Sequence, residues 1–326
     1  MRRLVILSAV VAAAACAAVG AARPAGTPSP LLAFKLFIDP NLPKLGQVVW
    51  TGRSFVYISE LNGTLKSSDP QGETASPYAT FDQGGEEMRC APSPGGRWMT
   101  GIFCHTADNR IVNVSLDGTK VTPFAQLPAT AGPESDGSIV FDHVGKFGRR
   151  MLVSSGGSFT NGGNIYAIST AGDVSLIGSY PGPGAADNIV VAPPKFGAIG
   201  GSVLIARDQT GVTGSVVAMN RRGVVQTLAA GLGNGINTIQ VLVPQPRRRS
   251  PNSAAPGLYF GDQASGNVYF APAAPLRRFS GDVLIGGEEH AWFWVLRPQG
   301  KKFQVLRLRT NLASKKWTLE GAAYVP

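Results

Sequence analysis

Short runs in which apolar and polar residues alternate recur along the chain, separated by turns rich in glycine. Residues 163–174 combine such a run with a tight turn that ends in Gly172 and a second apolar run. Residues 110–118 and 215–224 repeat the pattern, with the glycine at the equivalent place. Alternation at period two around a turn of this chemistry predicts a β-hairpin. The chain is therefore predicted to be built from repeated hairpins.

The hairpins recur at a nearly constant spacing. Weaker copies begin at residues 55, 268 and 303, so the first apolar positions form a series: Phe55, Ile111, Ile165, Val216, Val268 and Phe303. The first four intervals are 56, 54, 51 and 52 residues, and the last is 35. Two further strands are predicted before each hairpin, such as residues 139–141 and 151–153 before Ile165. Four strands per period match one propeller blade, so the sequence predicts an all-β, six-bladed β-propeller with four-stranded antiparallel blades.

The two ends of the chain are predicted to close the ring. We expect the last unit to contain strands near residues 290–296, 303–308 and 316–319, with residues 33–38 as its fourth strand. Residues 258–260 and 268–270 are expected to follow the strand at 239–241 within one blade. Closure leaves only short, protected edges. An open β-solenoid is the competing fold.

The N-terminus has the pattern of a signal peptide. Arg2 and Arg3 precede an apolar run at residues 4–15, and small residues continue to Ala22. We therefore predict a signal peptide at 1–22, a linker at 23–32 and the propeller at 33–326, in a protein that is secreted, periplasmic or held in the cell envelope. The apolar run is too short to span a bilayer, and no longer one follows, so no transmembrane span is expected. The mature protein is expected to be a monomer.

Cys16 leaves two possibilities open. It follows three alanines at the end of the apolar run, where a bacterial lipoprotein would carry its lipid attachment. Removal together with the signal peptide is the alternative.

Cys90 and Cys104 are predicted to form a disulfide. An exported protein meets an oxidising compartment, and residues 94–97 (PGGR) read as the turn of a hairpin that sets the flanking strands side by side. Two buried free thiols are the alternative.

The formal net charge is +10, with 30 Lys and Arg against 20 Asp and Glu. The basic residues come in short runs at predicted turns, such as 149–150, 221–222 and 247–249. No run is interleaved with aromatic residues, so we expect no specific nucleic-acid binding. General attraction to anionic polymers or membrane surfaces is compatible with this charge.

Acidic and amide residues recur where the innermost strand of each predicted blade begins. Because those strands converge on the channel, their oxygens could hold a hard cation such as Ca²⁺. The residues singled out as ligands are Glu87, Asp136, Asp187, Asn188, Asn237 and Glu289. Beside a cation, Glu87 or Glu289 could act as a general base. The competing interpretation is that these residues cap turns.

The strand pattern resembles that of a known group of propellers. A K-F-G turn at 146–148 and 195–197, an apolar strand and the hairpin at 163–174 are similar to blades of the SMP-30/gluconolactonase and NHL-like six-bladed propellers. The resemblance covers most of residues 86–272. It implies a propeller fold and, for the lactonases, a divalent cation held by a Glu, an Asn and an Asp from different blades. The chain lacks that family's E-G-P and N-D-G motifs, so the resemblance concerns fold more than activity.

Three functions remain open. The chain has no G-x-S-x-G motif, no P-loop and no dinucleotide fingerprint. We therefore expect a non-catalytic binding or scaffold protein whose partner is a small molecule, a glycan or a protein. A cation-dependent lactonase or related hydrolase is the alternative, and a quinone-dependent sugar dehydrogenase is the third.

Overall fold

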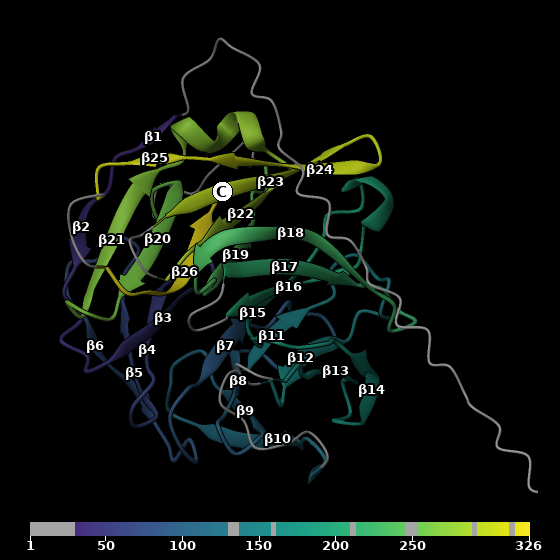
Figure 1. Cartoon of the computed structure of the whole chain (residues 1–326). Coiled ribbons are helices and arrows are strands. Elements are labelled where there is room, and N and C mark those ends of the chain that lie inside the picture. The colour runs from purple at the N-terminus through teal and green to yellow at the C-terminus, as the bar shows by residue number, and fades with distance from the viewer. Residues whose placement is uncertain are drawn as a thin grey trace, which may run out of the picture.

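Each of the first four blades is a meander of four antiparallel strands that runs from the inside of a ring outward. The computed structural model describes residues 30–129, 137–157, 161–208, 213–244, 253–288, 292–312 and 317–326, which form an all-β ring (Figure 1). Blade 1 contains β3 (Leu45–Trp50), β4 (Phe55–Ser59), β5 (Thr64–Ser68) and β6 (Ser76–Thr80). Blade 2 contains β7 (Arg89–Pro92), β8 (Ile102–His105), β9 (Arg110–Val114) and β10 (Val121–Gln126).

Blades 3 and 4 continue the same plan. Blade 3 contains β11 (Ser138–Phe141), β12 (Met151–Ser155), β13 (Asn164–Ile168) and β14 (Val174–Ser179). Blade 4 contains β15 (Ala185–Val191), β16 (Val203–Asp208), β17 (Thr213–Met219) and β18 (Val225–Asn234). A short 3₁₀ helix, Gly197–Ile199, lies in the turn between β15 and β16. The predicted hairpins of the repeat are therefore confirmed as the third and fourth strands of blades 2, 3 and 4.

Blades 5 and 6 are interleaved. Blade 5 contains β19 (Thr238–Val241), β22 (Val283–Gly286), β23 (Phe293–Gln299) and β24 (Lys302–Arg307). Blade 6 contains, from the outside inward, β2 (Lys35–Ile38), β21 (Asn267–Pro272), β20 (Gly257–Asp262) and β26 (Leu319–Val325). After β19 the chain thus leaves blade 5, forms the two middle strands of blade 6, passes through a 3₁₀ helix (Ala274–Phe279) and returns.

The closure by both ends of the chain is confirmed, but the predicted grouping of strands in the last two blades was wrong. The strands near residues 258 and 268 belong to the closing blade rather than to the blade of β19. The N-terminal β2 pairs with β21, and β1 (Leu31–Leu32) pairs in parallel with β25 (Arg309–Thr310). The prediction assigned these strands by their order in the sequence. The regular spacing of the hairpins does not show that the chain crosses into the neighbouring blade between β19 and β22.

Apolar residues between adjacent blades form the core. Phe55 of blade 1 packs on Tyr259 of blade 6, with ring centroids 4.4 Å apart, so aromatic packing joins the first and last blades. Phe103 of blade 2 meets Phe141 of blade 3 at 5.6 Å. Since such rings bury much apolar area, the blades are held together mainly by the hydrophobic effect.

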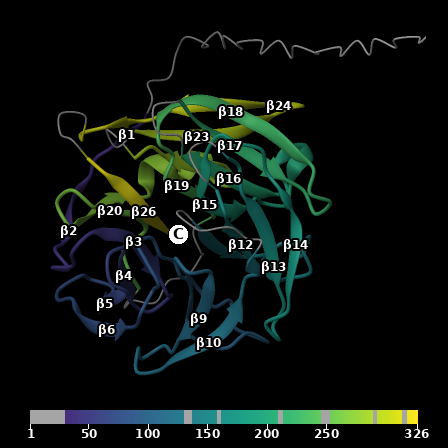
Figure 2. The ribbon, with the colours of Figure 1, turned by 60° about the horizontal axis from the view of Figure 1, so that its bottom comes forward.

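Six strands line the central channel: β3, β7, β11, β15, β19 and β26. Figure 2 shows them around the axis, with the C-terminus near the middle of the ring. The turns that precede these strands form what we call the entry face, and the turns that follow them form the exit face. The described part of the chain contains no helix that is long and apolar enough to cross a bilayer.

A disulfide joins Cys90 to Cys104, as predicted from the hairpin between them. The two residues are paired across β7 and β8, so the bond reinforces an inner strand of the channel. The predicted signal peptide, Cys16 and most of the predicted linker lie outside the described residues.

Candidate functional site

A buried arginine lies at the entry end of the channel. Arg89 begins β7, and only 1% of its surface is exposed. Its Nη1 pairs with Oε1 of Glu60 and lies 3.4 Å from Oε2 of Glu87. Its Nη2 lies 3.3 Å from both Oδ1 of Asp187 and Oε2 of Glu320. We call these five residues the Arg89 cluster.

The Arg89 cluster holds more negative than positive charge within a buried space. Burial alone would lower the pKa of Arg89, but the four surrounding carboxylates outweigh it and raise the pKa well above its usual range. Burial raises the pKa of Glu320 well above its usual range, and the negative charge of Glu60 adds to this, whereas Arg89 opposes it. The cluster therefore favours the charged form of Arg89 and shifts Glu320 toward its protonated form.

Neutral amides complete the hydrogen bonding of the cluster. Gln263 donates from Nε2 to Oε2 of Glu60 at 2.6 Å, and Asn237 donates from Nδ2 to Oε2 of Glu320 at 2.9 Å. Oδ1 of Asn237, Oγ1 of Thr238 and Nε of Arg89 are buried and have no hydrogen-bond partner among the described residues. Buried polar atoms of this kind need a partner, so water or a ligand hydroxyl can bind near them.

The structure brings part of the predicted acidic ring together. Glu87 and Asp187 belong to the Arg89 cluster, and Asn237 contacts its Glu320. Asn188 lines the channel one residue further along β15. Asp136 and Glu289 lie outside the described residues.

Three members of the cluster were not predicted from the sequence. Glu60 follows the second strand of blade 1, where no ligand was expected. Glu320 lies on β26, and the prediction ended the last strand at residue 319. Arg89 comes two residues after the pair Glu86 and Glu87, and this closeness in sequence was the one available signal.

The arrangement bears directly on the predicted cation. Oxygens of Glu60, Asp187 and Glu320 face the guanidinium of Arg89, which already supplies positive charge at the centre of the cluster. In the described ranges, no group of three or more His, Cys, Asp or Glu side chains is arranged to hold a metal ion. The carboxylates of the described residues therefore fit the guanidinium of Arg89 better than they fit a bound metal ion.

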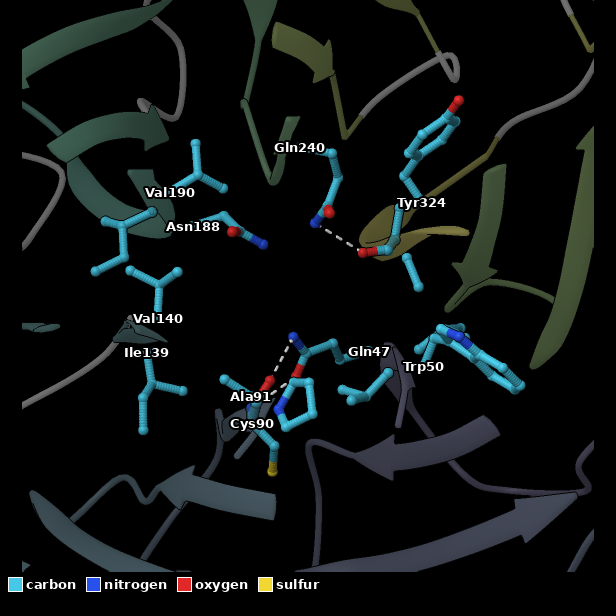
Figure 3. A pocket seen from close by; sticks show the side chains of 16 residues that line it. Gln47, Trp50, Cys90, Ala91, Ile139, Val140, Asn188, Val190, Gln240 and Tyr324 are labelled. Atoms are coloured by element: carbon cyan, nitrogen blue, oxygen red, sulfur yellow. Dashed lines mark hydrogen bonds between the residues drawn. The ribbon is translucent and has the colours of Figure 1, made fainter. Parts of the chain in front are cut away.

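A pocket of about 240 Å³ occupies the other half of the channel (Figure 3). In β7, β15 and β26, its lining residues come after the cluster residues along the strand. Its lining comes from all six inner strands: Gln47, Val48, Val49, Trp50, Cys90, Ala91, Pro92, Ile139, Val140, Asn188, Ile189, Val190, Gln240, Ala322, Ala323 and Tyr324. Trp50, Pro92 and Tyr324 lie at or near strand ends and are partly exposed. The pocket therefore opens toward the exit face, with the Arg89 cluster beyond its inner end.

The polar side chains of the pocket also connect neighbouring strands. Gln47 donates from Nε2 to the carbonyl of Cys90 at 3.1 Å, and its Oε1 accepts the Cys90 N–H at 2.7 Å. Gln240 donates from Nε2 to the carbonyl of Ala322 at 2.8 Å. These bonds fix the amide orientations and leave further hydrogen-bonding capacity toward the pocket. A preorganised set of amides among apolar residues is typical of small-molecule sites.

The comparisons with known proteins support the fold alone. A protein from Bifidobacterium bifidum with a provisional assignment as an exo-β-1,3-galactanase superposes with a TM-score of 0.50 at 9% identity, covering 88% of this chain and 99% of that one. The periplasmic gluconolactonase of Pseudomonas aeruginosa gives 0.42 at 13% identity, covering 86% and 88%. A provisionally assigned 6-phosphogluconolactonase from Bacteroides fragilis gives 0.47 at 9% identity, covering 87% and 75%.

No protein-family model and no curated protein sequence matches the chain. What is similar between this chain and the solved structures is therefore the propeller architecture.

Proposed function

We propose that the protein is a non-catalytic binding protein whose channel pocket takes a small, uncharged ligand with several hydroxyl groups, such as a sugar or a polyol. The observation that carries the proposal is the chemistry of the pocket. Its polar side chains are the amides of Gln47, Asn188 and Gln240. Among the described residues that line it, none is an Asp, Glu, His, Lys or Arg.

Size and shape support the same ligand class. A volume of about 240 Å³ suits one small molecule rather than a polymer segment. Figure 3 shows the rings of Trp50 and Tyr324 extending away from the centre of the pocket, so the ligand is expected to meet the amides and the aliphatic side chains. We further propose that the protein acts outside the cytoplasm, as the signal-peptide pattern and the disulfide suggest.

A thermal-shift screen tests the proposal. Neutral monosaccharides and polyols are expected to raise the Tm of the protein, because a ligand that binds only the folded state stabilises it. Asn188→Leu, which replaces a pocket amide by an apolar group of similar size, should abolish the shift. Asn220→Leu, in the turn between β17 and β18, is the matched control and should retain the shift. Shifts with sugar acids alone, or none with any hydroxylated ligand, would contradict the proposal.

The alternative is a cation-dependent lactonase related to the SMP-30/gluconolactonase group. It requires Ca²⁺ to bind at the entry end and Glu87 or Glu289 to act as the base. The proposed binding protein is expected to show the same Tm in EDTA and in added Ca²⁺, because the guanidinium of Arg89 already lies between the acids. A rise of Tm with Ca²⁺, together with turnover of lactones that Glu87→Gln abolishes, would replace our proposal by the lactonase.

A further inference from the structure

The two faces of the ring differ in charge. The exit face carries more basic than acidic residues, although Asp69, Glu73, Asp117 and Asp173 are exposed in its outer turns. Exposed acidic residues lie in turns of the entry face, among them Asp39, Asp82 and Glu86. Bases of this face are paired: Lys44 with Glu86, and Arg110 with Asp108. The exit face, onto which the pocket opens, carries most of the basic runs noted in the sequence.

The turns nearest the pocket mouth are basic. The turn after the inner strand carries an exposed base in each of blades 1 to 4, namely Arg53, Arg97, Lys146 and Lys195. In the described turns at 51–54, 93–101, 142–150 and 192–202, the one acidic residue is Asp142. Asp142 is buried, and its carboxylate accepts backbone N–H groups, for example from Gly145 at 2.8 Å and Phe147 at 2.7 Å. It therefore offsets little of the positive charge at the surface.

The basic turns of blades 3, 4 and 5 lie close together. The side chain of Lys146 packs over Gly201, and a Cβ on Gly197 would lie 3.1 Å from Pro298 of blade 5. Arg150 donates from Nη1 to Ser175 of β14, and the α-carbon of Gly223 lies close to Gly178 of the same strand. These contacts connect the turns that carry the exposed runs 149–150 and 221–222 with blade 5, whose outer turn carries 301–302. Arg297 of blade 5 donates from Nη2 to the carbonyl of Arg278 at 2.9 Å, which adds the run 277–278. The run at 247–249 lies outside the described residues.

Exposed apolar side chains lie beside these bases. Val224 is 61% exposed and follows Arg222 by two residues in the turn between β17 and β18. Met99 is 43% exposed in the turn that carries Arg97. Leu116 is 48% exposed in the turn that carries Lys120, where the exposed Asp117 offsets the charge of the lysine. Three turns of the exit face therefore each expose a basic side chain and an apolar side chain.

We propose that the exit face docks on an anionic lipid surface, with the pocket mouth turned toward the lipid headgroups. Basic residues near an anionic bilayer each add to the attraction, and apolar tips gain by entering the interface. A soluble anionic polymer would use the bases but gain nothing from exposed Val224, Met99 and Leu116. The presence of both kinds of residue on one face therefore favours a lipid surface as the partner.

Vesicle binding tests this proposal independently of the pocket ligand. The protein is expected to sediment with phosphatidylcholine vesicles that contain phosphatidylglycerol more strongly than with phosphatidylcholine alone, and the excess should fall with added salt. Arg221→Gln/Arg222→Gln should weaken the anionic-vesicle partition coefficient about 30-fold, from two lost surface cations. Val224→Ser should also weaken it while leaving the net charge unchanged.

The control variant removes the same charge from the opposite face. Lys44→Gln/Arg110→Gln changes the net charge equally and is expected to leave vesicle binding unchanged. Equal losses in the two double variants would overturn the proposal, because total charge rather than the exit face would then determine binding. Binding to dextran sulfate without an excess on anionic vesicles would overturn it in favour of a soluble polyanion. Equal binding to neutral and anionic vesicles would also overturn it.

Discussion

Arg89 and Glu320 meet at the entry end of the channel, where Nη2 of Arg89 lies 3.3 Å from Oε2 of Glu320 across a sequence separation of 231 residues. Arg89 begins the inner strand of blade 2, and Glu320 lies on the inner strand of blade 6. Asp187 adds the inner strand of blade 4 to the same guanidinium. One buried side chain thus connects three alternate blades, in addition to the packing between neighbours.

Removing the positive charge from this position should destabilise the ring strongly. Arg89→Met keeps much of the apolar volume but leaves four carboxylates close together without their counter-charge. Loss of one partner from a buried charge network typically costs about 3–5 kcal/mol of unfolding free energy. Urea denaturation of the variant measures this loss.

The control for Arg89→Met is Arg110→Met, which removes a partly exposed arginine that pairs with Asp108. A surface ion pair of this kind contributes about 1 kcal/mol at most. Similar unfolding free energies for the two variants would show that the Arg89 cluster adds no more to stability than a surface pair.

Glu320→Gln should change the dependence of stability on pH. The pKa of Glu320 is raised in the folded protein, so the folded state holds its proton more tightly than the unfolded state does. This contribution to stability is present at low pH and is lost as the pH rises through the raised pKa. Glutamine has no proton to lose, so the variant should gain stability relative to the parent as the pH rises. Denaturation at acidic and alkaline pH measures the difference, and a constant difference would contradict the prediction.

His105 should make the protein sensitive to mild acid. The ring is buried and its Nε2 lies 3.1 Å from Oδ1 of Asn109. Burial lowers the pKa of His105 from 6.5 to about 4. The unfolded state therefore takes up this proton first, and stability should fall by roughly 3 kcal/mol as the pH drops from about 6.5 to about 4.

The contribution of His105 can be isolated by substitution. His105→Gln removes the titrating group, so its unfolding free energy should fall less than that of the parent over the same pH range. If His105→Gln and the parent respond identically, His105 does not govern the acid response.

Reduction of the disulfide should lower stability by about 3 kcal/mol. Cys90 and Cys104 are 14 residues apart, and closing a loop of that length restricts the unfolded chain by about this amount. Cys90→Ser/Cys104→Ser should show the loss in denaturation experiments without reductant. Added reductant should then have no further effect on the variant, whereas an effect would place the reducible bond elsewhere.

The sequence predicted the hairpins and the number of blades, because both are determined by the local pattern of residues. Period-two alternation and the glycine turns determine hairpins, and their regular spacing gave six blades. The interleaving of blades 5 and 6 could not be predicted, because pairing between β20 and β26 depends on packing at the closure of the ring. The convergence of Glu87 and Asp187 followed from their places at strand entries. Glu60 and Glu320 required the three-dimensional register, since nothing in their sequence neighbourhood marks them as partners of Arg89.

The interleaved closing blades have a consequence for assembly during synthesis. Blades 1 to 4 consist of consecutive strands, so each can form as its residues leave the ribosome. The middle strands of blade 6 are made before most of blade 5, and β26 follows every other described strand. Until that segment arrives, one wall of the channel is missing and Arg89 lacks Glu320. An intermediate that lacks β26 would therefore leave the acids near Arg89 exposed along one side, and the ligand pocket can form only after β26 has been made.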